Sequence, residues 1–156
     1  MIRKFIIVML LMLSSTGLTN TSSINFAKDI DPTSLTKIHP QLRNIIIYIA
    51  GFCDQNRVKF VITSTIRSKK RNIEVNSKSL THVEGRAFDM SIRPEYGWSP
   101  DLVMKLTQNI ERKFGHLGAY TASGKQLLVF NHNANNGTLV HLHFQVYKNL
   151  PWDQGN

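Results

Sequence analysis

An alternating stretch near the C-terminus, residues 139–147, most constrains how this chain can fold. It alternates apolar and β-forming residues, which is typical of a strand. Residues two apart on a strand point to the same face, so His141 and His143 are expected to project together. The sheet that contains this strand is therefore expected to carry two neighbouring imidazoles on one face.

A second polar stretch places His82 and Asp89 on either side of Gly85. Their separation of seven residues is odd, so on one unbroken strand the two side chains would face opposite ways. Gly85 can supply the turn or bulge that brings both inward. Imidazole nitrogens and carboxylate oxygens are good zinc ligands, and catalytic zinc sites typically use three protein ligands. The alternative is that the histidines lie at the surface or core edge and that Asp89 caps a turn.

Three motifs of this chain resemble those of the zinc peptidases that act on bacterial peptidoglycan. In chain order they are residues 64–68 (STIRS), 82–89 (HVEGRAFD) and 141–145 (HLHFQ). The pattern is most similar to that of the D-alanyl-D-alanine carboxypeptidase and L-alanyl-D-glutamate peptidase family. The resemblance covers about residues 36–147, with the motifs in the family's order.

The resemblance implies a set of site residues and an activity. His82, Asp89 and His143 would bind one Zn²⁺ ion per chain, and Arg67 and Ser64 would belong to the substrate-binding wall. The implied protein is a secreted zinc metallopeptidase that hydrolyses a peptide bond in peptidoglycan stem peptides. It would be of the D,D-carboxypeptidase or the L-Ala-D-Glu endopeptidase type.

The chain departs from the family pattern at the position of the general base. Many members carry Asp or Glu three residues before the last zinc histidine, where this chain has Val140. It instead has His141 two residues before, as lysostaphin-type enzymes and murein endopeptidases do. His141 is therefore the candidate catalytic base, and Glu84 is a weaker one because it lies in the turn between two expected ligands. The missing carboxylate keeps open an alternative, a non-catalytic secreted cell-wall-binding module of the same fold.

The N-terminus, residues 1–23, predicts a secretory signal peptide. Arg3 and Lys4 precede an unbroken apolar run of nine residues, which small and polar residues follow. The run is shorter than the roughly 20 residues that a membrane span needs. The alternatives are an uncleaved N-terminal anchor and a buried strand. The mature chain is expected to be exported to the periplasm, the cell envelope or the extracellular space.

The charge of the chain favours an anionic partner. It has 19 Lys and Arg against 10 Asp and Glu; without Arg3 and Lys4, 17 basic and ten acidic residues remain, a net charge of +7. A basic exported protein is drawn to anionic cell-wall polymers or membranes. A secreted DNA-binding protein or nuclease is a third hypothesis. Basic residues cluster only over residues 67–71 and no nucleic-acid-binding motif is visible, so no nucleic-acid partner is expected.

The remaining pattern predicts one α+β domain over residues 24–156, with a small antiparallel sheet and two main helices. The resemblance implies the same, a fold like that of hedgehog and the D-Ala-D-Ala peptidases. Cys53, the only cysteine, is expected to be a small buried hydrophobe. Helices are expected from residue 40 to residues 54–56 and between Ser99 and Gly115. Strands are expected over residues 58–64, 85–92, 117–121, 126–130 and 140–147, and loops over residues 68–81 and 131–137. His132, in the second loop, could reach the site, but a solvated loop histidine is the commoner case.

Overall fold

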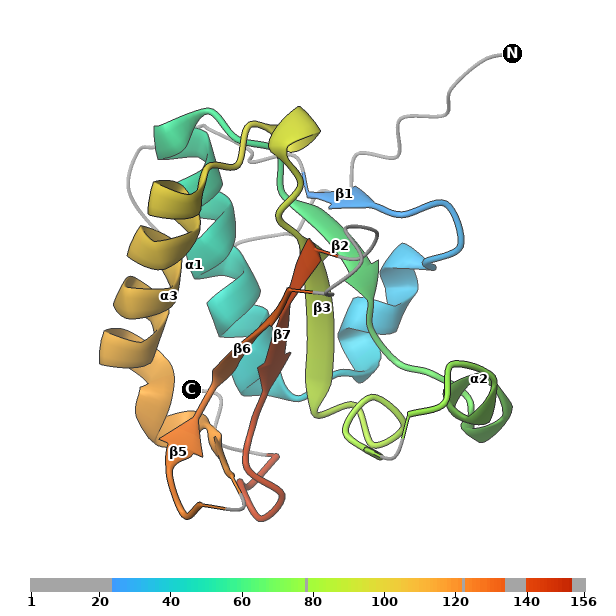
Figure 1. The fold of residues 1–156 in the computed structure, drawn as a ribbon. Helices are drawn as coiled ribbons and strands as arrows, with labels where there is room; N and C mark the ends of the chain where they lie inside the picture. The colour runs from blue at the N-terminus through green and yellow to red at the C-terminus, as the bar shows by residue number, and fades with distance from the viewer. Residues whose placement is uncertain (1–23, 78, 122, 134–139, 153–156) are drawn as a thin grey trace, which may run out of the picture.

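A computed structural model describes residues 24–77, 79–121, 123–133 and 140–152 (Figure 1). The predicted signal peptide, residues 1–23, lies outside the described residues, as does most of the predicted Asn-rich loop. Within the described ranges, no helix combines the length and the apolar character that a membrane span requires.

The centre of the fold is a five-stranded sheet with the order β1-β2-β3-β7-β6. Neighbouring strands are antiparallel except that β1 runs parallel to β2. The sheet is therefore mixed, and the prediction of a purely antiparallel sheet was wrong at this edge. The lead-in segment supplies the extra strand, in which the Asn25 backbone N–H donates to the Phe60 carbonyl oxygen at 2.9 Å. The strands are β1 (Asn25–Phe26), β2 (Val61–Ser64), β3 (Ala87–Ser91), β6 (Val129–Asn133) and β7 (Val140–Gln145).

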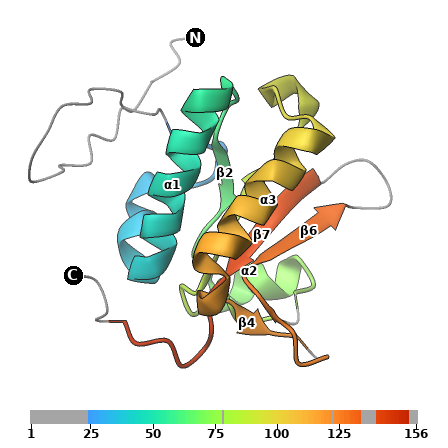
Figure 2. The same cartoon turned by 90° about the vertical axis from the view of Figure 1, so that its left-hand side faces the viewer.

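Two long helices, α1 (Pro40–Asn56) and α3 (Pro100–Phe114), lie side by side over one face of this sheet (Figures 1 and 2). Both start at a proline next to a capping side chain. His39 Nδ1 accepts from the Gln41 N–H, and Ser99 Oγ accepts from the Leu102 N–H. The two predicted helices and the coarse α+β class are confirmed. In the described part of the chain, three short 3₁₀ helices connect the elements: η1 (Pro32–Lys37), η2 (Pro94–Tyr96) and η3 (Gly115–Leu117).

Two predicted segments differ from the structure in their local form. Residues 68–81, expected to be a loop, contain the short helix α2 (Lys69–Glu74). Ser68 caps its first turn, and the buried Asn72 side chain donates to the carbonyl oxygens of Ser77 and Ser79. The predicted hairpin is the two-stranded sheet of β4 (Ala119–Tyr120) and β5 (Gln126–Leu127), while the residues after it form β6 in the main sheet.

The two faces of the main sheet have different chemistry because side chains alternate along each strand. On the helix-covered face, Phe88 of β3 and Phe144 of β7 are fully buried and stack with their ring centroids 4.6 Å apart. Such a pair contributes about 1 kcal/mol beyond the burial of its area. On the opposite face, β3 presents Asp89 and β7 presents His141 and His143. The apolar face thus fixes the register that brings the polar face together.

The edge strand β6 is held at its start by the carboxylate of Glu111 on α3. Glu111 Oε1 accepts hydrogen bonds from the backbone N–H groups of Leu128, at 2.9 Å, and Val129, at 2.7 Å. These groups lie where the chain enters β6, and β6 pairs with β7 along its length. The helix layer therefore helps to place the strand that borders the polar face.

Candidate metal centre

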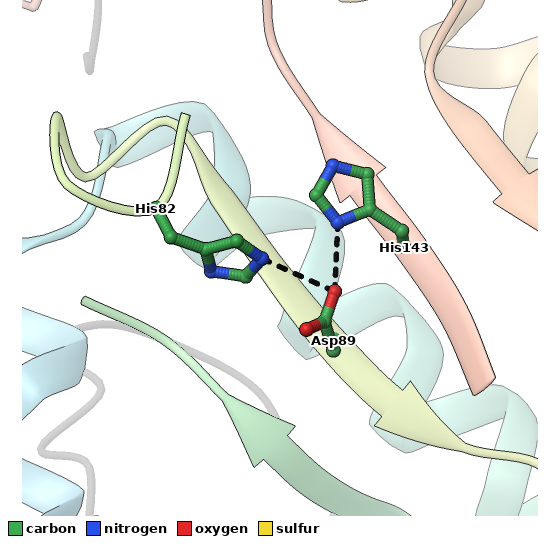
Figure 3. A group of neighbouring side chains, drawn as sticks. All are labelled: His82, Asp89 and His143. Atoms are coloured by element: carbon green, nitrogen blue, oxygen red, sulfur yellow. Dashed lines mark hydrogen bonds and ion pairs between the residues drawn. The ribbon is translucent and has the colours of Figure 1, made fainter. Parts of the chain in front are cut away.

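Three side chains on the polar face form a compact group that can hold a metal ion. One ligand atom from each of His82, Asp89 and His143 lies within 4.8 Å of the others. Figure 3 shows both imidazoles directed at the same carboxylate oxygen, Oδ1 of Asp89. His143 Nδ1 lies 2.7 Å from this oxygen and His82 Nε2 lies 3.3 Å from it. These are the three residues that the sequence motifs single out as ligands.

The backbone brings the three residues together in two ways. Asp89 and His143 are direct partners on the antiparallel strands β3 and β7. His82 reaches them from the turn before β3, which closes at Gly85 with a φ of 66°. A Cβ atom at this glycine would lie 2.7 Å from the Lys37 carbonyl oxygen. Gly85 therefore provides the predicted turn, and the close approach of the backbone leaves no room for a side chain.

Hydrogen bonding fixes the imidazole of His82 in the form that a metal ligand needs. Its Nδ1 lies 2.6 Å from the Thr65 carbonyl oxygen, which only accepts, so Nδ1 carries the proton. The other nitrogen, Nε2, then presents its lone pair toward Asp89. It is buried and has no hydrogen-bond partner among the described residues. A buried nitrogen of this kind, facing a carboxylate and a second imidazole, fits a metal ion between them.

The second imidazole is oriented in a similar way by its neighbour on β7. His143 Nε2 lies 3.2 Å from Oε1 of Gln145, an amide oxygen that accepts a hydrogen bond from this nitrogen. The nitrogen that faces Asp89 is Nδ1, 2.7 Å from Oδ1. Because a carboxylate oxygen only accepts, Nδ1 donates to it, and a bound metal ion would displace that proton. The two histidines thus use different ring nitrogens toward the same point, each with its other nitrogen bound to an oxygen.

Asp89 is an ionised carboxylate at the centre of the group, with only 5% of its surface exposed. Burial by itself would raise its pKa, but the adjacent imidazoles of His143 and His82 outweigh this and hold the pKa well below its usual range. Its second oxygen, Oδ2, accepts a hydrogen bond from Arg67 Nη2 at 2.8 Å. Two imidazole nitrogens and a carboxylate oxygen make up a donor set that suits a divalent ion such as zinc.

The predicted wall residues Arg67 and Ser64 lie in the same cleft as the metal group. The cleft has a volume of about 1030 Å³. Arg67 Nε donates to Ser64 Oγ at 2.9 Å while its Nη2 binds Asp89. A shift of register between Ile62 and Ser64 aligns Ser64 with Asp89. The guanidinium therefore contacts a candidate metal ligand, a role that sequence reasoning missed; its contact with a substrate stays a prediction.

The candidate base His141 also lines the cleft, on the same face of β7 as His143. The other candidate, Glu84, is exposed and pairs with Arg86 outside the lining of the cleft. Among the two candidate bases, only His141 therefore stands beside the metal group. The side chain of Val140 lies outside what the structure describes.

A fourth histidine lines the cleft where sequence reasoning expected a solvated loop. His132 belongs to β6, directly opposite His141, so the predicted loop was wrong at this residue. Its ring centroid lies 5.1 Å from that of His141 and 5.7 Å from that of His143. Burial, followed by the nearby charges of these two histidines, lowers the pKa of His132. Residues 131–133 are all polar, so no alternation marked the continuation of the strand here.

Comparisons with known proteins add no assignment. No family model, no curated protein and no solved structure matches this chain. The chemistry of the site is therefore argued from its own residues.

Proposed function

We propose that this protein is an exported zinc metallopeptidase that hydrolyses a peptide bond in peptidoglycan stem peptides. The observation that carries the proposal is the convergence of His82, Asp89 and His143 in an open cleft, with the imidazole of His141 beside them. Three N/O ligands leave a coordination position of the metal open, as catalytic rather than structural zinc sites do. The order of the motifs and the basic charge of the chain support the choice of substrate.

The ligands would be His82 Nε2, His143 Nδ1 and Asp89 Oδ1. Bound there, zinc would polarise the scissile carbonyl group and lower the pKa of a water molecule toward neutrality. Thr65 and Gln145 would hold the two imidazoles in their metal-binding tautomers through the hydrogen bonds described above.

His141 would move the proton. A ring nitrogen of His141 accepts a proton from the attacking water as its oxygen bonds to the carbonyl carbon. The same nitrogen then returns a proton to the amide nitrogen as the C–N bond breaks. The remaining proton of the water also passes to the released amine, so the products are a carboxylate and an ammonium group. His141 is half-buried in the cleft wall, which gives its ring access to both substrate and solvent.

Metal content and bond cleavage test the proposal together. The purified chain should bind one tight zinc equivalent, which His143→Ala should remove. Synthetic stem peptides, offered with one scissile bond at a time, should be cut at one position. His141→Ala should reduce kcat by at least about a hundredfold and retain the tight zinc, whereas His116→Ala, at an exposed histidine outside the cleft, should leave both kcat and the tight zinc unchanged.

Two results would contradict the proposal. A chain that takes up no zinc under any loading condition has no metal centre of this kind. A chain that holds zinc and binds stem peptides without cutting any bond is the non-catalytic wall-binding module, the alternative that Val140 leaves open.

A further inference from the structure

A second row of polar side chains crosses the sheet next to the metal group. The strand register aligns Ser91 of β3, His141 of β7 and His132 of β6. This row lies one pleat along from the row of Asp89 and His143, on the same face of the sheet. Both histidines line the cleft and are therefore accessible to solvent there. The adjacent row, with Asp89 and His143, contains two of the proposed zinc ligands.

The spacing of the two rings matches that of a pair of metal-binding imidazoles. A zinc ion about 2.0 Å from one nitrogen of each ring, at a tetrahedral angle, places two ring centroids about 5.2 Å apart. The centroids of His132 and His141 lie 5.1 Å apart. The centroids of His82 and His143, which flank the first metal position, are separated by the same 5.1 Å.

Buried Ser91, in the same row, carries a polar atom that hydrogen-bonds to neither histidine in this structure. Only 3% of its surface is exposed, and its Oγ has no hydrogen-bond partner among the described residues. A metal-binding imidazole is usually held by a hydrogen bond on its other nitrogen, and the register places Ser91 directly across from His141.

We propose that His132 and His141 form a second binding site for a divalent transition metal ion, weaker than the first, in the same cleft. Imidazole pairs suit Zn²⁺, Cu²⁺ and Ni²⁺, and water from the cleft completes the coordination. The site has two protein ligands where the first has three, and its ligands are more exposed than His82 and Asp89. It is therefore expected to fill at a higher zinc concentration than the first site.

This second site has a consequence that rests on the proposed function. His141 is a ligand of the second ion and the proposed base of the hydrolysis. An ion on its ring nitrogen occupies the lone pair that accepts the proton. Zinc in excess of one equivalent would therefore inhibit the peptidase, with His132 setting the concentration at which inhibition begins.

Zinc titration of the metal-free full-length chain by calorimetry tests the second site without any measurement of activity. The wild-type chain should show a tight and a weak equivalent. His132→Gln should weaken the second by at least about tenfold and leave the first unchanged. His82→Ala should weaken the first equivalent and leave the second unchanged, and the exposed control His116→Gln should retain both zinc equivalents.

A second measurement on the unmodified chain guards against effects of substitution on folding. The second zinc equivalent should shift the ring NMR signals of His132 and His141 and leave those of His116 in place. A wild-type chain that binds only one equivalent at millimolar zinc, or a His132→Gln variant whose second equivalent binds as in the wild type, overturns the second site. A chain that binds two equivalents but cuts no peptide leaves this site standing and removes the proposed function.

Discussion

Arg67 donates a hydrogen bond from Nη2 to Oδ2 of Asp89 across 2.8 Å, whereas the two imidazoles face the other oxygen, Oδ1. The two oxygens of Asp89 thus have separate partners. Oδ1 faces His82 and His143, while Oδ2 is held by a guanidinium that Ser64 braces in turn. Arg67 therefore restricts the rotation of the carboxylate and keeps one oxygen directed at the metal position.

Replacing Arg67 by methionine is expected to weaken zinc binding by about ten- to a hundredfold, because residues that orient a metal ligand contribute that much to affinity. Competition with a chromophoric chelator measures the change. Arg71→Met is the matched control, since Arg71 lines the same cleft but pairs with Glu74 at the surface. Equal affinities of the two variants would show that the bond to Asp89 does not support the metal.

Gly85→Ala is expected to cost about 3 kcal/mol of folding free energy, because a left-handed backbone strains any side chain and the new Cβ would lie 2.7 Å from the Lys37 carbonyl oxygen. Gly124→Ala separates the two causes. Gly124 also has a positive φ, of 78°, but nothing lies within 4 Å of its Cβ position, so about 1 kcal/mol is expected there. Urea denaturation of both variants gives the difference, and a similar loss in both would contradict the close approach.

Loss of the Glu111 carboxylate is expected to destabilise the chain by about 2 to 4 kcal/mol, since two backbone N–H groups at the start of β6 lose their acceptor. Glu111→Ala removes the acceptor, whereas Glu111→Gln keeps a carbonyl oxygen there and should cost less. Glu95→Ala, a surface residue paired with Arg93, should change stability by less than about 1 kcal/mol. Thermal unfolding followed by circular dichroism compares the three.

The cap of α1 is expected to make the chain sensitive to mild acid. His39 is fully buried, and burial lowers its pKa below the usual value. The unfolded chain therefore binds this proton more readily than the folded chain does. The stabilising contribution is complete above about pH 6.5, the usual histidine value, and declines as the pH falls below it.

The protonated ring can no longer accept from the Gln41 N–H at the start of α1. Urea midpoints measured from pH 7.5 down to pH 5 should fall in the wild-type chain. They should fall less in His39→Asn, whose amide can cap the helix at any of these pH values. A parallel decline in both chains would assign the acid sensitivity to other groups.

Local sequence signals determined the helices and the three candidate ligands. Proline and a capping residue mark the starts of α1 and α3, and these signals act within one turn of the helix. The alternation around His143 and the glycine after His82 likewise reflect short-range backbone geometry, so they could be recognised in the sequence. The mixed class of the fold, α+β, follows from the same local patterns.

Tertiary structure decided which side chains meet, because strand register is set by packing of the apolar face over long sequence distances. The irregular pairing of β2 with β3 aligns Ser64 with Asp89. The guanidinium of Arg67 hydrogen-bonds to both of these residues. The pairing of β6 with β7 places His132 opposite His141. Neither contact can be predicted from the spacing of residues along the chain. Each depends on the register between two strands, which the residues next to them in sequence do not specify.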